Sequence, residues 1–248
     1  DDPFLPLPSG FIHVEYDDID AVKKATTDRT VAVMVEPVQG EGGVNVPSDG
    51  YLTALRQWCD QNGLLLIFDE VQTGLGRLGA LFGYQVSGVE PDIITLAKGL
   101  GGGVPIGAFL AKDRAAVFEP KGEHGSTFGG NPLTCAAANA STRYIIDHAI
   151  HTNASEMGAY LKDGLERISK HHSFVTDVRG VGLLLAIEFK DDISADVLAE
   201  CNQRGLLLNA PSPTTIRIMP PLTINIEEIN TGLDRLESGI VEAAREAA

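Results

Sequence analysis

The sequence predicts an α/β fold with a mostly parallel sheet, followed by a smaller α+β domain. Continuous apolar, β-branched runs over 30–38 and 64–71 are typical of strands covered on both faces. A helical pattern with short connections separates these two runs, which is the βαβ unit of a parallel sheet. The pattern changes near residue 150, after which helices alternate with short strands. We therefore expect two domains, over 1–150 and 151–248.

Composition excludes several classes of partner. The 248 residues are enough for one large and one small core. The net charge of -15 and the lack of a basic stripe argue against nucleic acid. No apolar run has the length of a membrane span and no signal peptide is present, so we expect no membrane partner. Three widely spaced cysteines and no clustered metal ligands predict a cytoplasmic protein without a metal site.

The first part of the chain predicts alternating helices and strands. Ser48 is the expected N-cap of its clearest helix, and Pro132 suits the first turn of another. The expected elements are a helix over 18–27, a strand over 30–38, a helix over 50–62, strands over 64–71, 92–97 and 107–111, and a helix over 131–147.

The second part predicts a more exposed, mixed arrangement. The alternation and glycines of 178–189 indicate one half-exposed antiparallel strand. The other expected elements are helices over 156–171 and 194–204, strands over 205–209 and 216–219, and a closing helix from about residue 226.

Two charged residues follow neighbouring predicted strands. Lys98 comes after the run over 93–97, and Asp69 comes after five apolar residues. Ligands of open α/β sheets bind beyond the carboxyl ends of the strands, so both side chains should face one edge. Partial desolvation favours the neutral amine form of lysine, which attacks carbonyl carbons. Lys98 is thus a candidate Schiff-base nucleophile; alternatively, its stem covers the strand end and its ammonium group lies in water.

Asp69 suggests which carbonyl compound Lys98 would attack. A largely desolvated carboxylate needs a cationic partner or several donors. A protonated pyridine nitrogen meets this need, and pairing it with an acid keeps a pyridine cofactor electron-withdrawing. Lys98 with Asp69 is therefore the minimal set for pyridoxal phosphate (PLP). The alternative is a structural Asp69, paired with Arg77 or capping a turn.

Three further motifs have candidate roles. The run over 74–79 matches G-x-G-x-x-G, but it does not begin at a strand end, so a dinucleotide site is a weak prediction. Ser126 and Thr127 lie in a glycine loop before a helix, which suits a phosphate or is an ordinary capped loop. Arg217 lies in an apolar strand and needs a carboxylate, for which Glu41 is a candidate.

Five motifs in order resemble one family, the class III PLP-dependent aminotransferases. They are V-E-P-V-Q-G-E-G-G-V, F-D-E-V-Q-T-G-L-G-R-L-G, T-L-A-K-G-L-G-G-G-V-P-I-G, H-G-S-T-F-G-G-N-P-L and I-R-I-M-P-P-L. The resemblance runs from about residue 30 to the C-terminus. It implies the PLP-transferase fold type I, here incomplete, with 1–150 as the second half of the PLP-binding large domain and 151–248 as the small domain. It also implies a homodimer with shared active sites.

The resemblance assigns roles residue by residue. Lys98 binds the cofactor covalently and moves the proton, Asp69 holds the pyridinium nitrogen, and Gln72 lies near the phenolic oxygen. Thr127 reaches the phosphate, that of the neighbouring subunit, and Ser126 lies near the substrate. Arg217 takes a substrate carboxylate when Glu41 is not holding it. The implied cofactor-binding residues are Asp69, Glu70, Val71, Gln72, Lys98 and Thr127; the substrate-binding residues are Ser126, Glu41 and Arg217.

The implied reaction transfers the δ-amino group of N-acetylornithine to 2-oxoglutarate, in arginine biosynthesis. Ornithine, succinylornithine and 4-aminobutyrate are alternative donors, and an NAD-dependent oxidoreductase is a remote alternative from the glycine motif. Family members carry a long N-terminal portion that does not occur in this sequence. We therefore expect the 248-residue chain alone to bind PLP weakly and to have little activity.

Overall fold

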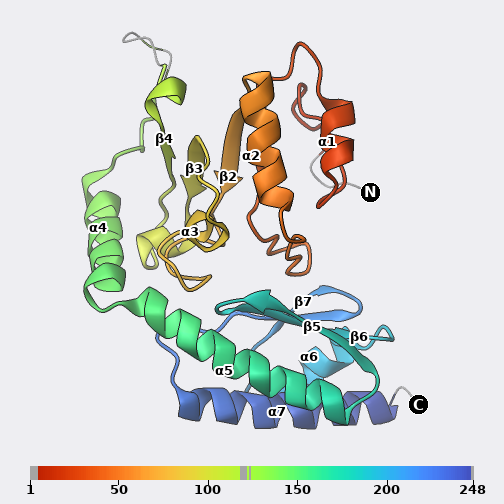
Figure 1. Cartoon of the computed structure of the whole chain (residues 1–248). Helices are drawn as coiled ribbons and strands as arrows, with labels where there is room; N and C mark the ends of the chain where they lie inside the picture. The colour runs from red at the N-terminus through yellow and green to blue at the C-terminus, as the bar shows by residue number, and fades with distance from the viewer. Residues whose placement is uncertain (1–4, 118–121, 123, 247–248) are drawn as a thin grey trace.

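A computed structural model describes residues 5–117, 122 and 124–246 and contains two four-stranded sheets (Figure 1). The first sheet has the order β1-β2-β3-β4, and the second has the order β5-β6-β8-β7. The strands of the first sheet are β1 (Ala32–Val35), β2 (Leu65–Asp69), β3 (Ile93–Leu96) and β4 (Ala108–Ala111). Those of the second are β5 (Val175–Val181), β6 (Leu184–Phe189), β7 (Asn209–Ser212) and β8 (Thr215–Ile218).

The first sheet is mostly parallel, as the sequence predicts. Strands β1, β2 and β3 run parallel, and β4 pairs antiparallel to β3 at the edge. Leu66 and Phe68 of β2 are fully buried in a cluster that includes residues of α2. Leu65 and Ile67, on the opposite face, are only half-buried, and all of β4 except its last residue is exposed. The expectation of strands covered on both faces is therefore wrong for this chain.

Six helices in the described part of the chain follow the predicted order with shifted ends, and a seventh, the short helix Gly83–Ser87, was not predicted. The helices are α1 (Ile19–Ala25), α2 (Tyr51–Asn62), α3 (Gly83–Ser87), α4 (Pro132–Asp147), α5 (Ile150–His171), α6 (Ser194–Gln203) and α7 (Ile226–Glu246), with 3-10 turns η1 (Lys98–Gly101) and η2 (Asp113–Ala115). Ser48 is not the N-cap of α2, because its amide and hydroxyl both bond to the Asp17 carboxylate. Gly50 takes that position with a φ of 90°, which glycine adopts at little cost.

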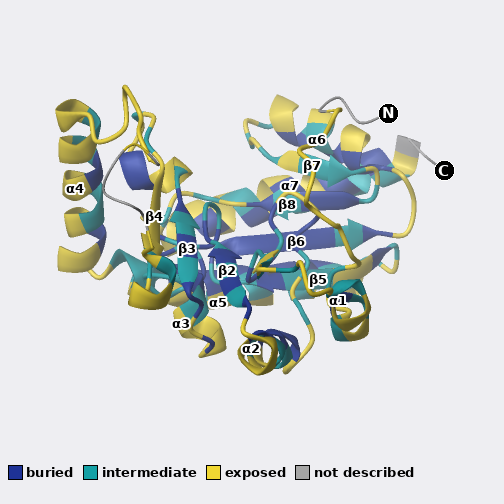
Figure 2. Cartoon of the chain, turned by 90° about the horizontal axis from the view of Figure 1, so that it is seen from above, coloured by how far each residue is buried: buried dark blue, intermediate teal, exposed yellow. Residues whose placement is uncertain are grey.

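The segment over 178–189 forms two strands, not one. Gly182, with a φ of 58°, makes the turn between β5 and β6. A Cβ there would lie 2.6 Å from the carbonyl oxygen of Arg77, so glycine also permits this close approach. Strand β6 pairs with both β5 and β8, and five of its six residues are buried (Figure 2). Its mostly apolar sequence therefore reflects a central position in the sheet, not a half-exposed one.

The two sheets are joined by helices α4 and α5 and by direct contacts. Arg77, on the loop after β2, donates from Nη1 to the carbonyl oxygens of Leu183 at 3.1 Å and Pro220 at 2.6 Å. Arg77 is thus not the partner of Asp69. Burial lowers the pKa of Arg77 to about 10. A small apolar cluster lies at the same junction; its residues are Val38, Val44, Leu78, Leu184 and Ala186.

No helix in the described part of the chain is both long and apolar enough to cross a membrane.

Candidate active site

Lys98 lies just beyond the carboxyl end of β3, where η1 begins. Its φ of 45° is in the left-handed region, which is uncommon for a residue with a side chain. The residue is exposed, and its Nζ makes no hydrogen bond or salt bridge to the described residues. The expected desolvation of Lys98 is therefore wrong in this chain, because β3 ends two residues earlier and nothing described covers the ammonium group.

Asp69 is the last residue of β2 and faces β3. Its Oδ1 accepts from the Val71 amide at 3.0 Å and from the Thr95 hydroxyl at 3.1 Å. The bond from Val71 is the turn-capping contact considered as an alternative. Oδ2 accepts no hydrogen bond from the described residues. Asp69 is half-buried, less than its sequence predicts, because it continues the less covered face of Leu65 and Ile67.

Glu70 is the fully buried acid of this strand end. Only 1% of Glu70 is exposed, and its carboxylate accepts from the amides of Gly83 and Tyr84 at the start of α3. Burial raises the pKa of Glu70 in spite of these bonds. Strand alternation turns this side chain away from Asp69, so the predicted cofactor contact of Glu70 has no support from its side-chain partners.

The structure brings Glu41, Gln72 and Arg217 together. Arg217 of β8 donates from Nη1 to Glu41 Oε2 at 2.7 Å and to Gln72 Oε1 at 3.3 Å. The Arg217 side chain is 11% exposed, whereas that of Glu41 is 73% exposed. A nearly buried cation is thus paired with a carboxylate that is free to turn into solvent. Such a pair can open for a competing carboxylate.

We expect Gly40→Ala to displace the Gln72 side chain. A Cβ at Gly40 would lie 1.8 Å from Gln72 Oε1, so the carboxamide must move away from Arg217. The loss of that hydrogen bond should lower the free energy of unfolding by about 1 kcal/mol, measured by urea denaturation. Gly125→Ala is the matched control, since a Cβ there meets nothing within 4 Å. Equal losses in both variants would contradict the proposed clash.

Sequence reasoning missed Glu36, which directly follows β1. The Gly40 amide donates to Glu36 Oε2 at 3.1 Å. Burial raises the pKa of Glu36; the Gly40 bond and Lys98 lower it, while Asp69 and Glu41 add to the increase. These influences place Glu36 among the other charged groups of the site. The rule that found Asp69 and Lys98, a charged residue at the end of a parallel strand, would also have found Glu36.

Ser126 and Thr127 lie in the loop before α4. Both are exposed, and Ser126 Oγ accepts from the Gly129 amide at 2.8 Å. Asn131 caps α4 by accepting from the Leu133 amide at 3.0 Å. No hydrogen bond or ion pair in the described part of the chain joins Ser126 or Thr127 to Lys98 or Asp69. The local contacts are those of a capped loop.

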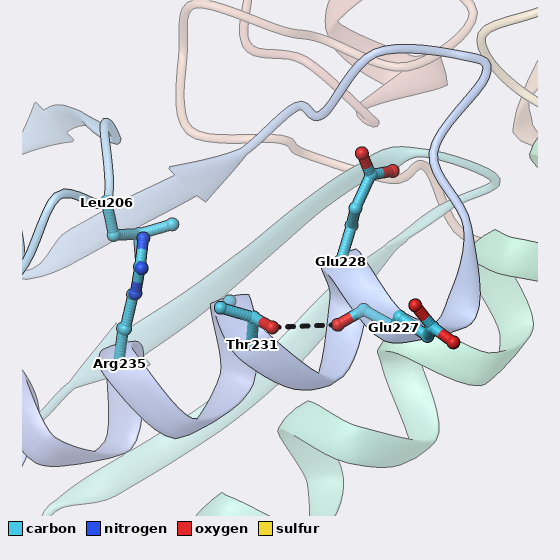
Figure 3. Close-up of a pocket in the computed structure, with 6 residues that line it drawn as sticks. Leu206, Glu227, Glu228, Thr231 and Arg235 are labelled. Carbon is cyan, nitrogen blue, oxygen red and sulfur yellow. Dashed lines mark hydrogen bonds between the residues drawn. The ribbon is translucent and has the colours of Figure 1, made fainter.

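Two other features contain none of the predicted catalytic groups. The glycine motif over 74–79 is a series of turns, and α3 begins only at Gly83, so no helix N-terminus follows the strand end as a dinucleotide site requires. A surface pocket of about 370 Å³ lies along α7 (Figure 3). There Thr231 donates to the Glu227 carbonyl at 2.9 Å, and Arg235 donates to the Gly205 carbonyl at 2.9 Å. These contacts belong to the helix and its neighbouring loop.

The fold is that of a PLP-dependent transferase of fold type I. The sequence model described as Aminotransferase class-III matches residues 4–240, and the chain belongs to this family. Its members are PLP-dependent transaminases that use small-molecule amino donors and keto acids.

Individual proteins of this family are similar to the chain in sequence and in structure. The chain is 50% identical over 236 residues to an acetylornithine aminotransferase of Methanothermobacter thermautotrophicus. The aligned region covers 95% of this chain and 60% of that protein. Among solved structures, it is similar to the ornithine aminotransferase of Toxoplasma gondii, with a TM-score of 0.92 and 38% identity over 98% of this chain and 58% of the other. It is also similar to the N-acetylornithine aminotransferase of Stenotrophomonas maltophilia, with a TM-score of 0.87 and 36% identity. That match covers 97% of this chain and 64% of the other. The chain thus spans about 60% of the length of the curated relatives that it matches.

Proposed function

We propose that the protein is an aminotransferase that moves the δ-amino group of N-acetylornithine to 2-oxoglutarate. In this proposal residues 1–150 form the second half of the PLP-binding domain, and residues 151–248 form the small domain. The observation that carries it is the position of Asp69 and Lys98 after the carboxyl ends of adjacent parallel strands. The loop after Asp69 also joins the Arg217–Glu41 pair, through the bond from Arg217 to Gln72. The names of the curated relatives support the choice of donor.

The residues of this edge suit PLP. Asp69 has a carboxylate oxygen, Oδ2, without a donor in the described chain, which fits a pyridinium N–H. Its other oxygen is held by Thr95, which fixes the orientation of the carboxylate. Lys98 has a primary amine without a hydrogen-bonding partner among the described residues, which suits covalent attachment to an aldehyde. We assign Asp69, Gln72 and Lys98 to the cofactor ring and Thr127 to its phosphate. When bound, PLP withdraws electrons from the substrate carbon that loses its proton.

The chain's own groups then perform two tasks. With PLP bound, Lys98 Nζ would accept the proton from the substrate carbon that bears the amino group and would carry it between that carbon and the cofactor. Arg217 holds a carboxylate of the acceptor, and Glu41 occupies Arg217 when the substrate presents no carboxylate there. One site can in this way accept both an ω-amine and a dicarboxylate.

A substrate panel tests this assignment. The protein should be expressed with any residues that its gene encodes before Asp1, loaded with PLP, and assayed with N-acetylornithine, ornithine, succinylornithine and 4-aminobutyrate. N-acetylornithine should give the highest kcat/KM with 2-oxoglutarate as acceptor. Ornithine is the second candidate, because solved structures of ornithine aminotransferases are among the similar ones. Transamination of none of the four donors would overturn the proposal.

We further propose a homodimer with shared sites. No hydrogen bond or ion pair joins Thr127 to Lys98 or Asp69 within the described chain, which fits a role for Thr127 at the phosphate of a neighbouring subunit. Exposed apolar side chains lie on β4 and near the start of α4, where Phe109 is 45%, Leu110 50% and Leu133 74% exposed. These residues offer an apolar surface for a partner. Light scattering should give twice the mass of one chain, and a monomer that is fully active would contradict shared sites.

The 248-residue chain alone should bind PLP weakly and turn over little substrate. The exposure of Lys98 supports this, since nothing in the described chain shields its amine from water. The measurement is PLP affinity, by absorbance titration, and transamination by the isolated chain. Robust transamination by the isolated chain would contradict the expectation.

A further inference from the structure

We propose that Arg179 is a positioning residue that holds the Glu41 loop and thereby sets the balance between amine donor and dicarboxylate acceptor. The inference rests on the proposed function, because it concerns the Glu41–Arg217 pair of that site. Arg179 lies on β5 in the second sheet, whereas Glu41 belongs to the loop after β1. Figure 1 shows this loop between the helix α2 and the second sheet.

Arg179 binds the Glu41 loop through one main-chain carbonyl group, that of Gly43. Its Nε donates to the Gly43 carbonyl oxygen at 3.0 Å, and its Nη2 donates to the same oxygen at 2.7 Å. Nη2 also donates to Glu188 at 2.8 Å, and Nη1 donates to Asp177 at 3.1 Å. The Arg179 side chain is 23% exposed, so these bonds are partly shielded from water. Two acids fix the guanidinium plane, and two of its N–H groups converge on the loop.

Glu188 is itself held firmly. Both of its carboxylate oxygens accept hydroxyl hydrogen bonds, from Thr214 and from Thr215. Thr215 is the first residue of β8, the strand that also carries Arg217. The network therefore connects the strand of Arg217 to the loop of Glu41 by a second route, independent of the Arg217–Glu41 contact.

Hydrogen bonds join the two ends of the loop, so the hydrogen bonds that hold Gly43 also restrict the position of Glu41. Gln39 and Asn45 bond to each other through both main chains at 3.0 Å, and their side chains bond at 2.8 Å. Val44 is fully buried against the second sheet in spite of a φ of 56°, which is strained for a β-branched residue. Glu41 lies two residues from Gly43, at the exposed tip of this closed loop.

The consequence concerns competition for Arg217. Glu41 and a substrate carboxylate both bind the Arg217 guanidinium, so the position of Glu41 determines how easily a dicarboxylate enters. Without the hydrogen bonds from Arg179, the loop samples other positions, and Glu41 competes less well with a substrate carboxylate for Arg217. Arg217 is then more available to 2-oxoglutarate and glutamate, and the discrimination in favour of an ω-amine donor falls.

The test compares Arg179→Gln with Glu41→Gln and with the double variant, in the PLP-loaded protein expressed with any residues encoded before Asp1. We expect Arg179→Gln to lower the KM for 2-oxoglutarate by about threefold to tenfold with little change in kcat. Glu41→Gln should have the same effect or a larger one. In the Glu41→Gln background, Arg179→Gln should add less than about twofold, because the residue it positions is already gone.

Two further measurements separate positioning from a structural role. Calorimetry with glutarate as a probe should show tighter binding to Arg179→Gln by a similar factor. Arg235→Gln is the matched control, since Arg235 also donates to a carbonyl, that of Gly205, but lies on α7; it should change neither KM nor glutarate affinity. A fall in kcat for donor and acceptor alike, or an undiminished effect in the double variant, would overturn the inference. If the wild type lacks transaminase activity, the proposed function fails instead.

Discussion

Lys98→Ala is expected to reduce transamination by at least about 10⁴-fold. The variant loses the amine that attaches the cofactor and the base that moves the substrate proton, and no other described lysine lies at this strand edge. Because Lys98 is exposed and makes no hydrogen bond in the described chain, its removal should leave the free energy of unfolding nearly unchanged. The measurements are kcat for the δ-amino donor and urea denaturation of the same preparation.

Lys112→Ala is the control for the loss of a lysine. Lys112 follows β4 and pairs at 3.2 Å with Glu90, with 43% and 66% of the two side chains exposed. Its removal should change kcat by less than about twofold and stability by less than about 1 kcal/mol. Turnover by Lys98→Ala at the rate of Lys112→Ala would refute the catalytic role of Lys98.

Asp92→Asn is expected to cost about 3–5 kcal/mol of the free energy of unfolding. Asp92 precedes β3 at the edge opposite the candidate site, and its side chain is 4% exposed. The carboxylate accepts from Arg56 at 2.9 Å, from the Leu66 amide at 2.8 Å and from Arg114. An asparagine there removes the carboxylate that Arg56 and Arg114 share, and it leaves Arg56 with only the exposed Asp60.

The pH dependence of stability should reveal the same carboxylate. Burial by itself raises the pKa of Asp92, but the bonds from Arg114, Leu66 and Arg56 outweigh it and hold the pKa well below its usual range. Because the folded pKa is depressed, the stabilisation is complete above the unfolded value of about 3.9 and is lost as the pH falls through the folded value. The difference between wild type and Asp92→Asn should therefore shrink from about pH 7 to about pH 3.

Asp60→Asn is the matched control for this pair of measurements. Asp60 also binds Arg56, at 2.7 Å, but 58% of its side chain is exposed. Its loss should cost less than about 1 kcal/mol at any pH. A cost for Asp92→Asn no larger than that of Asp60→Asn would contradict the structural role of the buried carboxylate.

The arrangement of the candidate site could be predicted from sequence because parallel strands end at one edge of a sheet. The runs before Asp69 and Lys98 identified two strand ends, and the structure pairs Asp69 with Thr95 across them. The apolar setting of Arg217 likewise indicated a carboxylate partner, and Glu41 lies 2.7 Å away. Local sequence therefore contained both features, since each depends on a charged residue at an apolar position.

Other features depend on tertiary packing and could not be predicted. The strand pattern did not distinguish Glu70, which caps α3, from Asp69, since both follow the same apolar run. Arg179 lies in the segment over 178–189, for which the sequence predicts only a half-exposed strand. Its partner, the Gly43 carbonyl, belongs to a distant loop and is found only in the folded chain. The exposure of Lys98 depends on what covers the sheet edge, which strand-by-strand reasoning does not include.

The most direct test of the central claim is chemical labelling of Lys98. The protein, expressed with any residues encoded before Asp1, should be incubated with PLP, reduced with borohydride, digested and mapped by mass spectrometry. We predict that the phosphopyridoxyl group is found on the peptide that contains Lys98, and that Lys98→Ala abolishes the label. A label on Lys112 or another lysine, or no label at all, would contradict the assignment of Lys98 as the cofactor-binding residue.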